Sequence, residues 1–379
     1  MKVLFKKITY LYKNETVLGI SATAALFTMF LVPPSADYLE YLDLRVLSLL
    51  FCLMAVVAGL NKTGVFIMLS EKLLHRLKNT RTLCLVLILL CFFSSMWITN
   101  DVALITFVPF ALMILDMTGL KKHIIFVVVM QTIAANLGSM LTPVGNPQNL
   151  YLYSTFDVPV VEFFRITLPI TVASFIFIFV PLLFVKKESI PTQNLQHNNR
   201  PVCSLPKIIL YSSLFLICLA CVLRFLDYRI VLIVVFLCIL LFDRSILKKV
   251  DFSLLITFVC FFVFVGNIGV STSHFNYKEL LSGRVLPISI ILSQFISNVP
   301  AAVLLSTFTD EYKALILGTN IGGLGTLVAS LASLISYKFY MKTDDASAGK
   351  YLFVFTIYNL VFLILLVSFY WLGSVMSVT

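Results

Sequence analysis

Residues 135–149 read ANLGSMLTPVGNPQN, and residues 319–333 read TNIGGLGTLVASLAS. The two stretches align without a gap, 184 positions apart, with asparagine, glycine and threonine at matching places. Both lie in apolar segments of membrane length, where non-helical backbone is tolerated only if protein or a water-filled cavity surrounds it. Interrupted helices at corresponding places in two halves of a chain are typical of a transporter's substrate site. The identical pairs are Asn136 and Asn320, Gly138 and Gly322, and Thr142 and Thr326.

The composition of the 379-residue chain is that of an integral membrane protein. Sixty per cent of the residues are hydrophobic and 12% are charged, which leaves too little polar surface to cover a soluble globule. The net charge of +10 predicts no nucleic-acid partner, because the basic residues lie in short loops between apolar runs, where they orient a membrane protein. The cysteines and histidines form no metal-binding cluster. We therefore expect no organic cofactor, and no metal site beyond one for a sodium ion.

We expect an all-α polytopic membrane protein with nine transmembrane spans and two re-entrant helical hairpins. A span needs about 20 predominantly apolar residues. Two further apolar stretches, 82–115 and 284–308, are each interrupted by a polar triplet and are expected to form the hairpins as shorter, paired segments. The spans are placed at residues 15–32, 44–61, 122–152, 166–185, 207–224, 229–242, 252–268, 312–338 and 350–373.

The charged loops decide how these segments are threaded. The lysine-rich N-terminus and the basic stretch 62–81 are expected inside, because basic loops stay in the cytoplasm. If residues 82–115 crossed the membrane once, the loop with Lys121 and Lys122 would fall outside. This segment is therefore expected to enter and return, and the same reasoning makes 284–308 a hairpin from the opposite face. The N-terminus is then inside and the C-terminus outside.

This order and direction of the membrane segments predict two inverted-topology repeats, each with scaffold helices, a hairpin and a broken helix. An N-terminal span occupies residues 1–40, and a cytoplasmic linker at 187–206 joins the repeats. The first repeat covers 41–186, with its hairpin at 82–115 and its broken helix at 122–152. The second covers 207–379, with its hairpin at 284–308, its broken helix at 312–338 and a final span at 350–373.

Cysteine labelling tests this topology. A cysteine placed near Lys121 should react with a membrane-impermeant reagent from the cytoplasmic side, and one near Lys313 should react from the outside. The reason is that each hairpin returns the chain to the face from which it entered. Labelling of either site from the opposite face would contradict the re-entrant hairpins.

The polar triplets of the two hairpins also correspond. Residues 95–101 read SMWITND and residues 293–299 read SQFISNV, 198 positions apart. Hairpin tips and helix breaks leave backbone amides and carbonyls without helical partners, so helix N-termini can attract an anion while carbonyl and amide oxygens suit sodium. The residues expected to bind substrate are Thr99, Asn100, Asn146, Gln148, Asn149, Ser297, Asn298, Asn320 and Thr326. Those expected to bind a coupling ion are Asp101, Asn100, Thr142, Gly145, Asn298 and Gly322.

Asp101 is the most distinctive residue of the candidate site. It is the only acidic residue between Glu71 and Asp116, and an ionisable group at membrane depth is costly and is a functional candidate by default. We expect it to bind a coupling sodium ion or proton. The alternative is a hairpin cap, because aspartate readily accepts hydrogen bonds from backbone amides. For Asn100 and Asn298 the alternative is turn formation, and for the glycines it is close helix packing.

These motifs resemble those of the ion transporter superfamily, which includes divalent-anion/sodium symporters, citrate carriers, arsenite permeases and certain sodium/proton antiporters. Those families share the hairpin followed by a broken helix, and the resemblance covers the chain from about residue 40. The nearest resemblance is to a group of anion-permease-like bacterial inner-membrane proteins. They combine a Thr-Asn-Asp tip, a Thr-Pro-x-Gly-Asn-Pro-Gln-Asn break and a Ser-Asn-Val-Pro tip, which begin here at Thr99, Thr142 and Ser297.

The resemblance implies a scaffold domain, often a homodimer interface, and a transport domain that moves in an elevator-like displacement. In the dicarboxylate branch each tip reads Ser-Asn-Thr, and its hydroxyls and amides hold substrate carboxylates. Here the two triplets end in Asp101 and Val299 instead. The final threonine is missing from both, so the resemblance does not by itself imply a preference for di- or tricarboxylates.

Together, these features predict a secondary active transporter of a small anion, a carboxylate or an oxyanion, coupled to sodium or protons. It should be a multi-pass protein of a bacterial inner membrane and form a homodimer. The alternatives are a sodium/proton antiporter without an organic substrate, and an ion channel, which also uses re-entrant loops and carbonyls. An enzyme is not expected, because the spans contain no paired aspartates, His-Glu motif or Ser-Lys arrangement.

Overall fold

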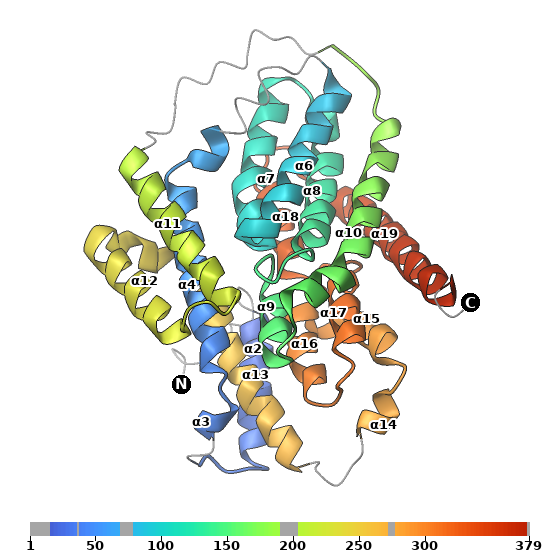
Figure 1. Ribbon diagram of the computed structural model, residues 1–379. Coiled ribbons are helices and arrows are strands. Elements are labelled where there is room, and N and C mark those ends of the chain that lie inside the picture. Colours follow the sequence, from blue (N-terminus) through green and yellow to red (C-terminus); the bar gives the residue numbers. More distant parts are fainter. Residues whose placement is uncertain (1–15, 36–37, 69–78, 190–203, 272–276, 377–379) are drawn as a thin grey trace, which may run out of the picture.

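A computed structural model of the protein describes residues 16–35, 38–68, 79–189, 204–271 and 277–376 (Figure 1). Within these ranges the regular structure is helical, apart from one isolated bridge between Asn79 and Ser189. The all-α expectation is therefore confirmed for this part of the chain. Residues 1–15 and most of the linker expected at 187–206 lie outside the described ranges.

The helices follow the apolar segments of the sequence. In the first half they are α2 Thr16–Met29, α3 Tyr38–Tyr41, α4 Leu44–Lys62, α6 Thr80–Ile98, α7 Asn100–Met117, the 3-10 helix η1 Lys121–His123, α8 Ile124–Ser139, α9 Pro147–Thr155 and α10 Val160–Leu183. In the second half they are α11 Leu205–Val222, α12 Tyr228–Phe242, the 3-10 helix η3 Arg244–Lys249, α13 Phe252–Ser271, α14 Tyr277–Leu281, α15 Val285–Ile296, α16 Asn298–Ser306, α17 Tyr312–Ile321, α18 Leu331–Tyr340 and α19 Ala348–Met376.

Eight helices in the described ranges are long and apolar enough to cross a membrane. This count differs from the nine spans that the sequence predicts, because the eight include both arms of the first hairpin, α6 and α7. In contrast, α2 and α12, with 14 and 15 residues, fall below the length of a full span, and the expected span 312–338 is divided into α17 and α18, with 10 residues each. The protein is thus polytopic, but its apolar segments are divided differently from the prediction.

The two hairpins differ in length. The arms α6 and α7 contain 19 and 18 residues, and a helix of that length spans about 27–28 Å, close to the ~30 Å hydrocarbon core of a bilayer. The arms α15 and α16 contain only 12 and 9 residues. The expectation of short arms is therefore wrong for the first hairpin. It rested on the polar triplet that interrupts each apolar stretch, and such a triplet marks the turn without fixing the length of the arms.

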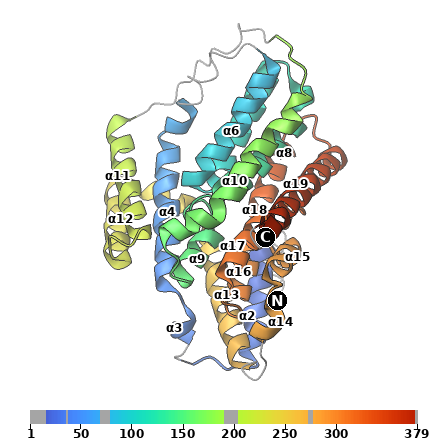
Figure 2. The same ribbon diagram turned by 45° about the vertical axis from the view of Figure 1, so that its right-hand side comes forward.

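Both predicted helix breaks are present. Helix α8 ends at Ser139 and α9 begins at Pro147, while α17 ends at Ile321 and α18 begins at Leu331. Around them, α4 packs against α11 and α12, and α13 packs against α2. Figure 2 shows α4, α11 and α12 side by side at one edge of the molecule, apart from α6, α8, α10 and α19. The breaks therefore lie within a group of helices that is flanked by α4.

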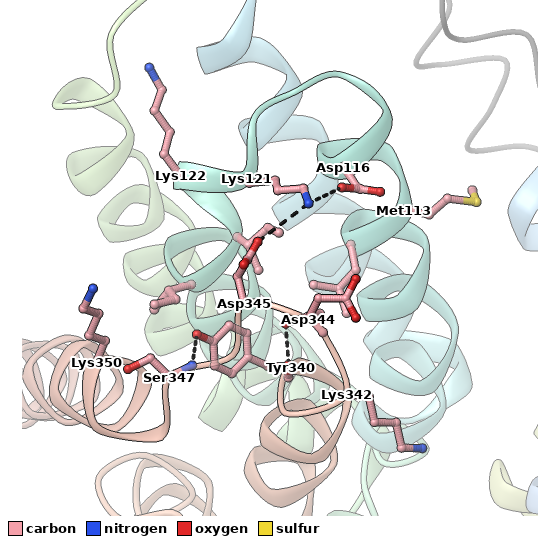
Figure 3. Close-up of a pocket in the computed structure, with 14 residues that line it drawn as sticks. Met113, Asp116, Lys121, Lys122, Tyr340, Lys342, Asp344, Asp345, Ser347 and Lys350 are labelled. Atoms are coloured by element: carbon pink, nitrogen blue, oxygen red, sulfur yellow. Dashed lines mark hydrogen bonds and ion pairs between the residues drawn. The ribbon is translucent and has the colours of Figure 1, made fainter.

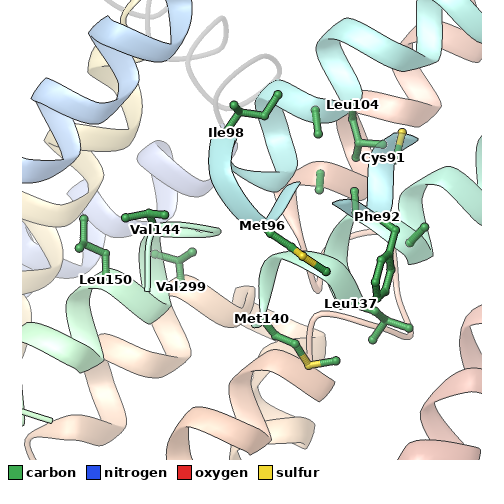
Figure 4. Close-up of a cluster of buried hydrophobic side chains, with 14 of the residues drawn as sticks. Cys91, Phe92, Met96, Ile98, Leu104, Leu137, Met140, Val144, Leu150 and Val299 are labelled. Atoms are coloured by element: carbon green, nitrogen blue, oxygen red, sulfur yellow. The ribbon is translucent and has the colours of Figure 1, made fainter. Parts of the chain in front are cut away.

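The first hairpin packs closely against α8. Cys91 and Phe92 of α6, Leu104 of α7 and Leu137 of α8 are each at most 1% exposed, and they lie in one apolar cluster (Figure 4). Gly138 permits this approach, because a Cβ atom there would lie 2.0 Å from the Phe92 carbonyl oxygen. In lipid, small residues stabilise helix pairs by letting the backbones come into van der Waals contact.

Ion pairs connect helix ends outside the apolar segments. The Lys62 ammonium at the end of α4 lies 2.7 Å from the Asp243 carboxylate after α12, and this hydrogen bond lowers the pKa of that carboxyl below its ordinary value. Lys122 similarly pairs with Glu188 at 2.8 Å and lowers the pKa of the glutamate carboxyl. Exposed pairs contribute little to stability, so these contacts chiefly fix how the helix ends are placed.

Candidate functional site

Each hairpin turns on one strained residue. Helices α6 and α7 are joined through Thr99, with φ 67° and ψ 151°, and α15 and α16 through Ser297, with φ 75° and ψ 154°. Positive φ is uncommon for residues other than glycine, and such strain persists where surrounding contacts impose it, often at functional sites. Two corresponding positions thus adopt the same unusual backbone.

Each tip is hydrogen-bonded to the break that follows it. The Asn100 N–H donates to the Gly145 carbonyl at 3.0 Å, and the Asn298 N–H donates to the Ala329 carbonyl at 3.0 Å. These acceptors are 184 positions apart, like the matching residues of the two breaks. A threonine of each break also donates its hydroxyl to the first arm of its hairpin, Thr142 to the Met96 carbonyl and Thr326 to the Gln294 carbonyl. The two halves use corresponding residues for corresponding bonds.

Asparagines order the first break. Asn146 is the N-cap of α9: its Oδ1 accepts the Asn149 N–H at 3.0 Å, and Pro147 follows at the first helical position, where proline is favoured. The Asn149 side chain donates to the carbonyls of Met140 and Thr142 at 3.3 Å each. The Asn149 amide thereby supplies donors to carbonyls beyond the end of α8, where helical partners are missing.

Gln294 has the corresponding role in the second break, although it is not among the residues predicted from the sequence. Its Nε2 donates to the carbonyls of Gly322 at 3.0 Å and Leu324 at 2.9 Å, and its Oε1 accepts the Thr326 N–H at 2.9 Å. Gly325 adopts φ 110°, and a Cβ atom there would collide with the Gln294 amide. The signal available in the sequence is a lone amide side chain within an apolar arm.

Five buried asparagines form a cluster at the breaks, termed here the asparagine cluster: Asn100, Asn136, Asn146, Asn149 and Asn320. Each is at most 4% exposed. Asn146 Nδ2 donates to Asn320 Oδ1 at 3.2 Å, and Asn320 Nδ2 donates to Asn149 Oδ1 at 2.6 Å. Asn100 Nδ2 donates to Asn136 Oδ1 at 3.1 Å. Asparagines predicted separately in the two halves therefore meet.

Asn136 also forms hydrogen bonds with residues of the second half. Its Oδ1 accepts the Ser330 hydroxyl at 3.0 Å, and its Nδ2 donates to the Gly323 carbonyl at 3.4 Å. Buried polar groups need such partners, because an unpaired group away from water is costly. In this conformation the asparagine cluster binds the two halves to each other. Each of these amides therefore already has a protein partner.

A cavity of about 400 Å³ lies beside the first tip, and this volume is typical of small-molecule sites. Leu331, Leu334, Ile335 and Lys338 line it at helical spacing, so it follows α18 for about 10 Å. Apolar residues of α4 also line it. The polar residues of the lining are Thr99, Asp101, Asn146, Lys249, Asp251, Ser253, Thr257 and Lys338.

Asp101 lies in the first turn of α7 and lines this cavity. Its Oδ1 is buried and accepts no hydrogen bond within the described part of the chain. It does not cap the helix: Thr99 holds the N-cap position, and the Asp101 N–H itself donates to the Asn100 side chain at 2.9 Å. A buried carboxylate without a partner is costly. Its position therefore favours the uptake of a proton or a cation.

A family model described as a citrate transporter matches residues 10–314. The chain belongs to the citrate transporter family. The resemblance to citrate carriers of the ion transporter superfamily is thereby confirmed. This family and the eight apolar helices identify the chain as a multi-pass membrane transporter.

Three similar proteins come from three organisms. The transporter MJ0456 of Methanocaldococcus jannaschii is 32% identical over 326 residues, which cover 84% of this chain and 87% of the relative. The inner membrane protein YbiR of Escherichia coli K12 is 28% identical, over 76% of this chain and 77% of its own length. The silicon efflux transporter LSI3 of Oryza sativa subsp. japonica is 30% identical, over 46% of this chain and 35% of its own length. Their names describe transporters and a membrane protein.

Three of the predicted ligand residues line the cavity of this citrate transporter family member: Thr99, Asp101 and Asn146. The others lie outside the lining. Those that are buried there are Asn100, Thr142, Gly145, Gln148, Asn149, Ser297, Asn298, Asn320 and Gly322, and Thr326 is exposed.

Three charged lining residues are absent from the predicted set: Lys249, Asp251 and Lys338. In the sequence the two lysines look like loop charges that orient the protein, and Asp251 lies two positions after Lys249. Their placement depends on how η3, α13 and α18 pack. No local pattern indicates it.

A second cavity, of about 510 Å³, lies between the end of α7, η1 and the loop that joins α18 to α19 (Figure 3). Lys121 lies 3.1 Å from the Asp116 carboxylate and 3.7 Å from that of Asp345. The Ser347 N–H donates to the Tyr340 hydroxyl at 2.9 Å. This lining contains none of the predicted ligand residues, so the cavity beside Asp101 is the candidate substrate site.

Proposed function

We propose that this transporter is secondary active and carries a small anion, a carboxylate or an oxyanion, coupled to sodium or protons. The observation that carries the proposal is Asp101, whose buried Oδ1 accepts no hydrogen bond within the described residues and which lines a cavity of about 400 Å³ beside a strained hairpin tip. Membership of the citrate transporter family supports a carboxylate. The rice relative is named a silicon efflux transporter, which supports considering inorganic substrates beside carboxylates.

Positive electrostatic features of the cavity support an anion. Helix α7 begins at Asn100 and α9 at Pro147, and helix N-termini carry a partial positive charge that favours anions. Lys249 and Lys338 add two ammonium groups to the lining, which offset the carboxylates of Asp101 and Asp251. The substrate then binds between the first tip and these lysines, with Thr99 and Asn146 as hydrogen-bonding partners. The other predicted substrate residues contact the substrate when the asparagine cluster gives up hydrogen bonds within the protein for hydrogen bonds to the substrate.

Asp101 is the proposed carrier of the coupling ion. Sodium prefers oxygen ligands, and the predicted set around the first tip offers carboxylate, amide, hydroxyl and carbonyl oxygens, the donor types that hard cations take. A proton on Asp101 would remove the same negative charge without needing other ligands. Either ion offsets the cost of a buried carboxylate and lets an anion approach the tip with less repulsion.

The hydrogen bonds between tips and breaks support an elevator movement of inverted repeats. Because Asn100 is bonded to Gly145 and Asn298 to Ala329, each hairpin can travel together with its broken helix. Helices α4, α11 and α12, which pack on one another at one edge, then supply the scaffold, and a homodimer in a bacterial inner membrane would form through such a scaffold. Alternating access follows when the hairpin group slides along α4.

A thermal-shift screen of the purified protein against citrate, arsenite, smaller carboxylates and sodium tests the proposal. A ligand that binds the folded state stabilises it by about 2.7 kcal/mol at 100 times its Kd. The expected result is stabilisation by one class of anion that increases with sodium or with lower pH. Stabilisation by sodium alone would favour the alternative, a sodium/proton antiporter. Single-channel currents far above carrier turnover would favour a channel.

A further inference from the structure

The ends of α9 and α11 share an unusual termination. At the end of α11 the Phe225 N–H donates to the Ala220 carbonyl at 2.9 Å, and at the end of α9 the Val158 N–H donates to the Tyr153 carbonyl at 3.2 Å. This bond closes a Schellman motif, whose preceding residue adopts a left-handed conformation and is usually glycine. Those residues are Arg224, with φ 69°, and Asp157, with φ 52°.

These two strained residues form an ion pair with each other. Arg224 Nη2 lies 2.8 Å from Asp157 Oδ1. The same guanidinium donates to the carbonyls of Tyr153 at 3.4 Å, Val158 at 3.5 Å and Asp157 at 3.5 Å, and it lies 5.1 Å from the centroid of the Tyr153 ring. A cation is favourable at a helix C-terminus and over an aromatic face. Arg224 of one helix end therefore caps the other.

The pair connects the two groups of helices that the proposed function sets in relative motion. Arg224 follows α11, which packs against α4 in the scaffold group. Asp157 follows α9, whose opposite end carries Asn146 and Pro147 in the lining of the cavity. A contact at one end of this nine-residue helix therefore affects where its other end lies relative to α4.

The pair and the charged end of the cavity lie at opposite ends of the scaffold. Helix α12 begins just after Arg224 and ends before Asp243, which pairs with Lys62 at the end of α4. Its 15 residues span about 22 Å. Lys249 of the cavity lies in η3, beyond Asp243. The lysines of the cavity therefore lie towards one end of the scaffold, and the Arg224–Asp157 pair, which joins the two groups of helices, lies at its other end.

We propose that the Arg224–Asp157 pair is a positioning contact of the transport cycle, which holds α9 against the end of α11 while the cavity is accessible from the Lys249 end. The pair breaks when the hairpin group moves along the scaffold. This proposal rests on the proposed function, because it assigns the contact to a movement between the two groups. It also accounts for an arginine and an aspartate where glycine would fit the backbone better.

Two cysteine reporters in membrane vesicles test the pair, each read as the rate of reaction with a membrane-impermeant maleimide. Val158→Cys is at a buried position beside the pair, 1% exposed, and Ile335→Cys lines the cavity. Arg224→Gly removes the guanidinium and relieves the left-handed strain, so the chain keeps its fold. With Arg224→Gly, the labelling rate of Val158→Cys should increase about fivefold, which is the change in population expected when one good exposed ion pair is lost. The labelling rate of Ile335→Cys from the Lys249 end should decrease.

The controls separate positioning from a local cap. Arg229→Ala is the matched control. Arg229 lies nearby in the first turn of α12 but bonds only to its neighbours Asp227 and Tyr228 within the described ranges, so its replacement should change neither rate. Exchanging the charges, with Arg224→Asp and Asp157→Arg together, should restore both rates towards those of the parent. The native cysteines also react with the maleimide, so the labelling of the parent protein without a reporter cysteine is subtracted from each rate.

The two reporters give distinct outcomes. Faster labelling of Val158→Cys with unchanged labelling of Ile335→Cys would reduce the pair to a local helix cap and overturn the proposal, as would two unchanged rates. Opposite changes at the two reporters support it. If those changes occur but no anion is taken up under any imposed gradient, the proposed function fails and the positioning contact stands.

Discussion

Replacing Asp101 by asparagine is expected to leave a folded, membrane-inserted protein whose uptake no longer responds to a sodium or pH gradient. Asparagine keeps the size and an acceptor oxygen of aspartate but not its charge, so it fits the tip and cannot carry the coupling ion. Coupling free energies are typically about 1–3 kcal/mol, or about 5- to 150-fold. Gradient-driven accumulation should therefore fall by at least about fivefold.

Uptake into proteoliposomes, with and without an imposed gradient, measures this loss. The matched control is Asp116→Asn, which changes an exposed carboxylate at the far end of the same helix, where Asp116 pairs with Lys121. That variant should retain normal coupling. Normal gradient-driven uptake by Asp101→Asn would instead place the coupling ion among the amides and carbonyls around Asn100, Asn146 and Asn149.

Gly138→Ala is expected to destabilise the protein and to displace the first hairpin. The added Cβ would lie 2.0 Å from the Phe92 carbonyl oxygen and 2.7 Å from the Ser95 hydroxyl, so α6 and α8 must move apart. Overpacking of this kind costs about 1–3 kcal/mol or more. Because α6 leads directly into Thr99, its displacement should also disturb the tip and the neighbouring cavity.

Thermal unfolding in detergent measures this effect. Gly349→Ala in α19 is the matched control, because a Cβ atom there meets nothing within 4 Å. Alanine is a better helix former than glycine by about 0.5–1 kcal/mol, so this variant should unfold at the same temperature as the parent or a higher one. Equal midpoints for Gly138→Ala and the parent would show that α6 and α8 can separate at no cost, against the packing described above.

The tips and breaks could be predicted from the sequence because their signals are local. Polar triplets and glycines within apolar runs conflict with a continuous helix, and the structure changes direction at Thr99 and Ser297 and interrupts helices after Ser139 and Ile321. Repetition of the pattern in both halves also predicted that matching positions are built alike. Matching hydrogen bonds at Asn100 and Asn298 agree with that prediction.

The remaining features depend on packing between distant segments. Gln294 stabilises the second break through bonds to residues 28 to 32 positions away, and Arg224 reaches across 67 positions to Asp157. Lys249 and Lys338 enter the cavity lining only because η3 and α18 lie beside the first tip. In the sequence such residues look like ordinary loop charges or a single amide. Only the tertiary arrangement distinguishes them.

The bonds of Asn136 have a consequence for biogenesis. Contacts within the first half, such as that between Asn100 and Asn136, span 36 positions, whereas Asn136 reaches Gly323 and Ser330 across 187 and 194 positions. Short loops close at a lower entropic cost than long ones, so the first half can assemble while the ribosome still synthesises the second. Until those later residues enter the bilayer, the Asn136 amide has unmet polar groups. The nascent first half must shield them from lipid.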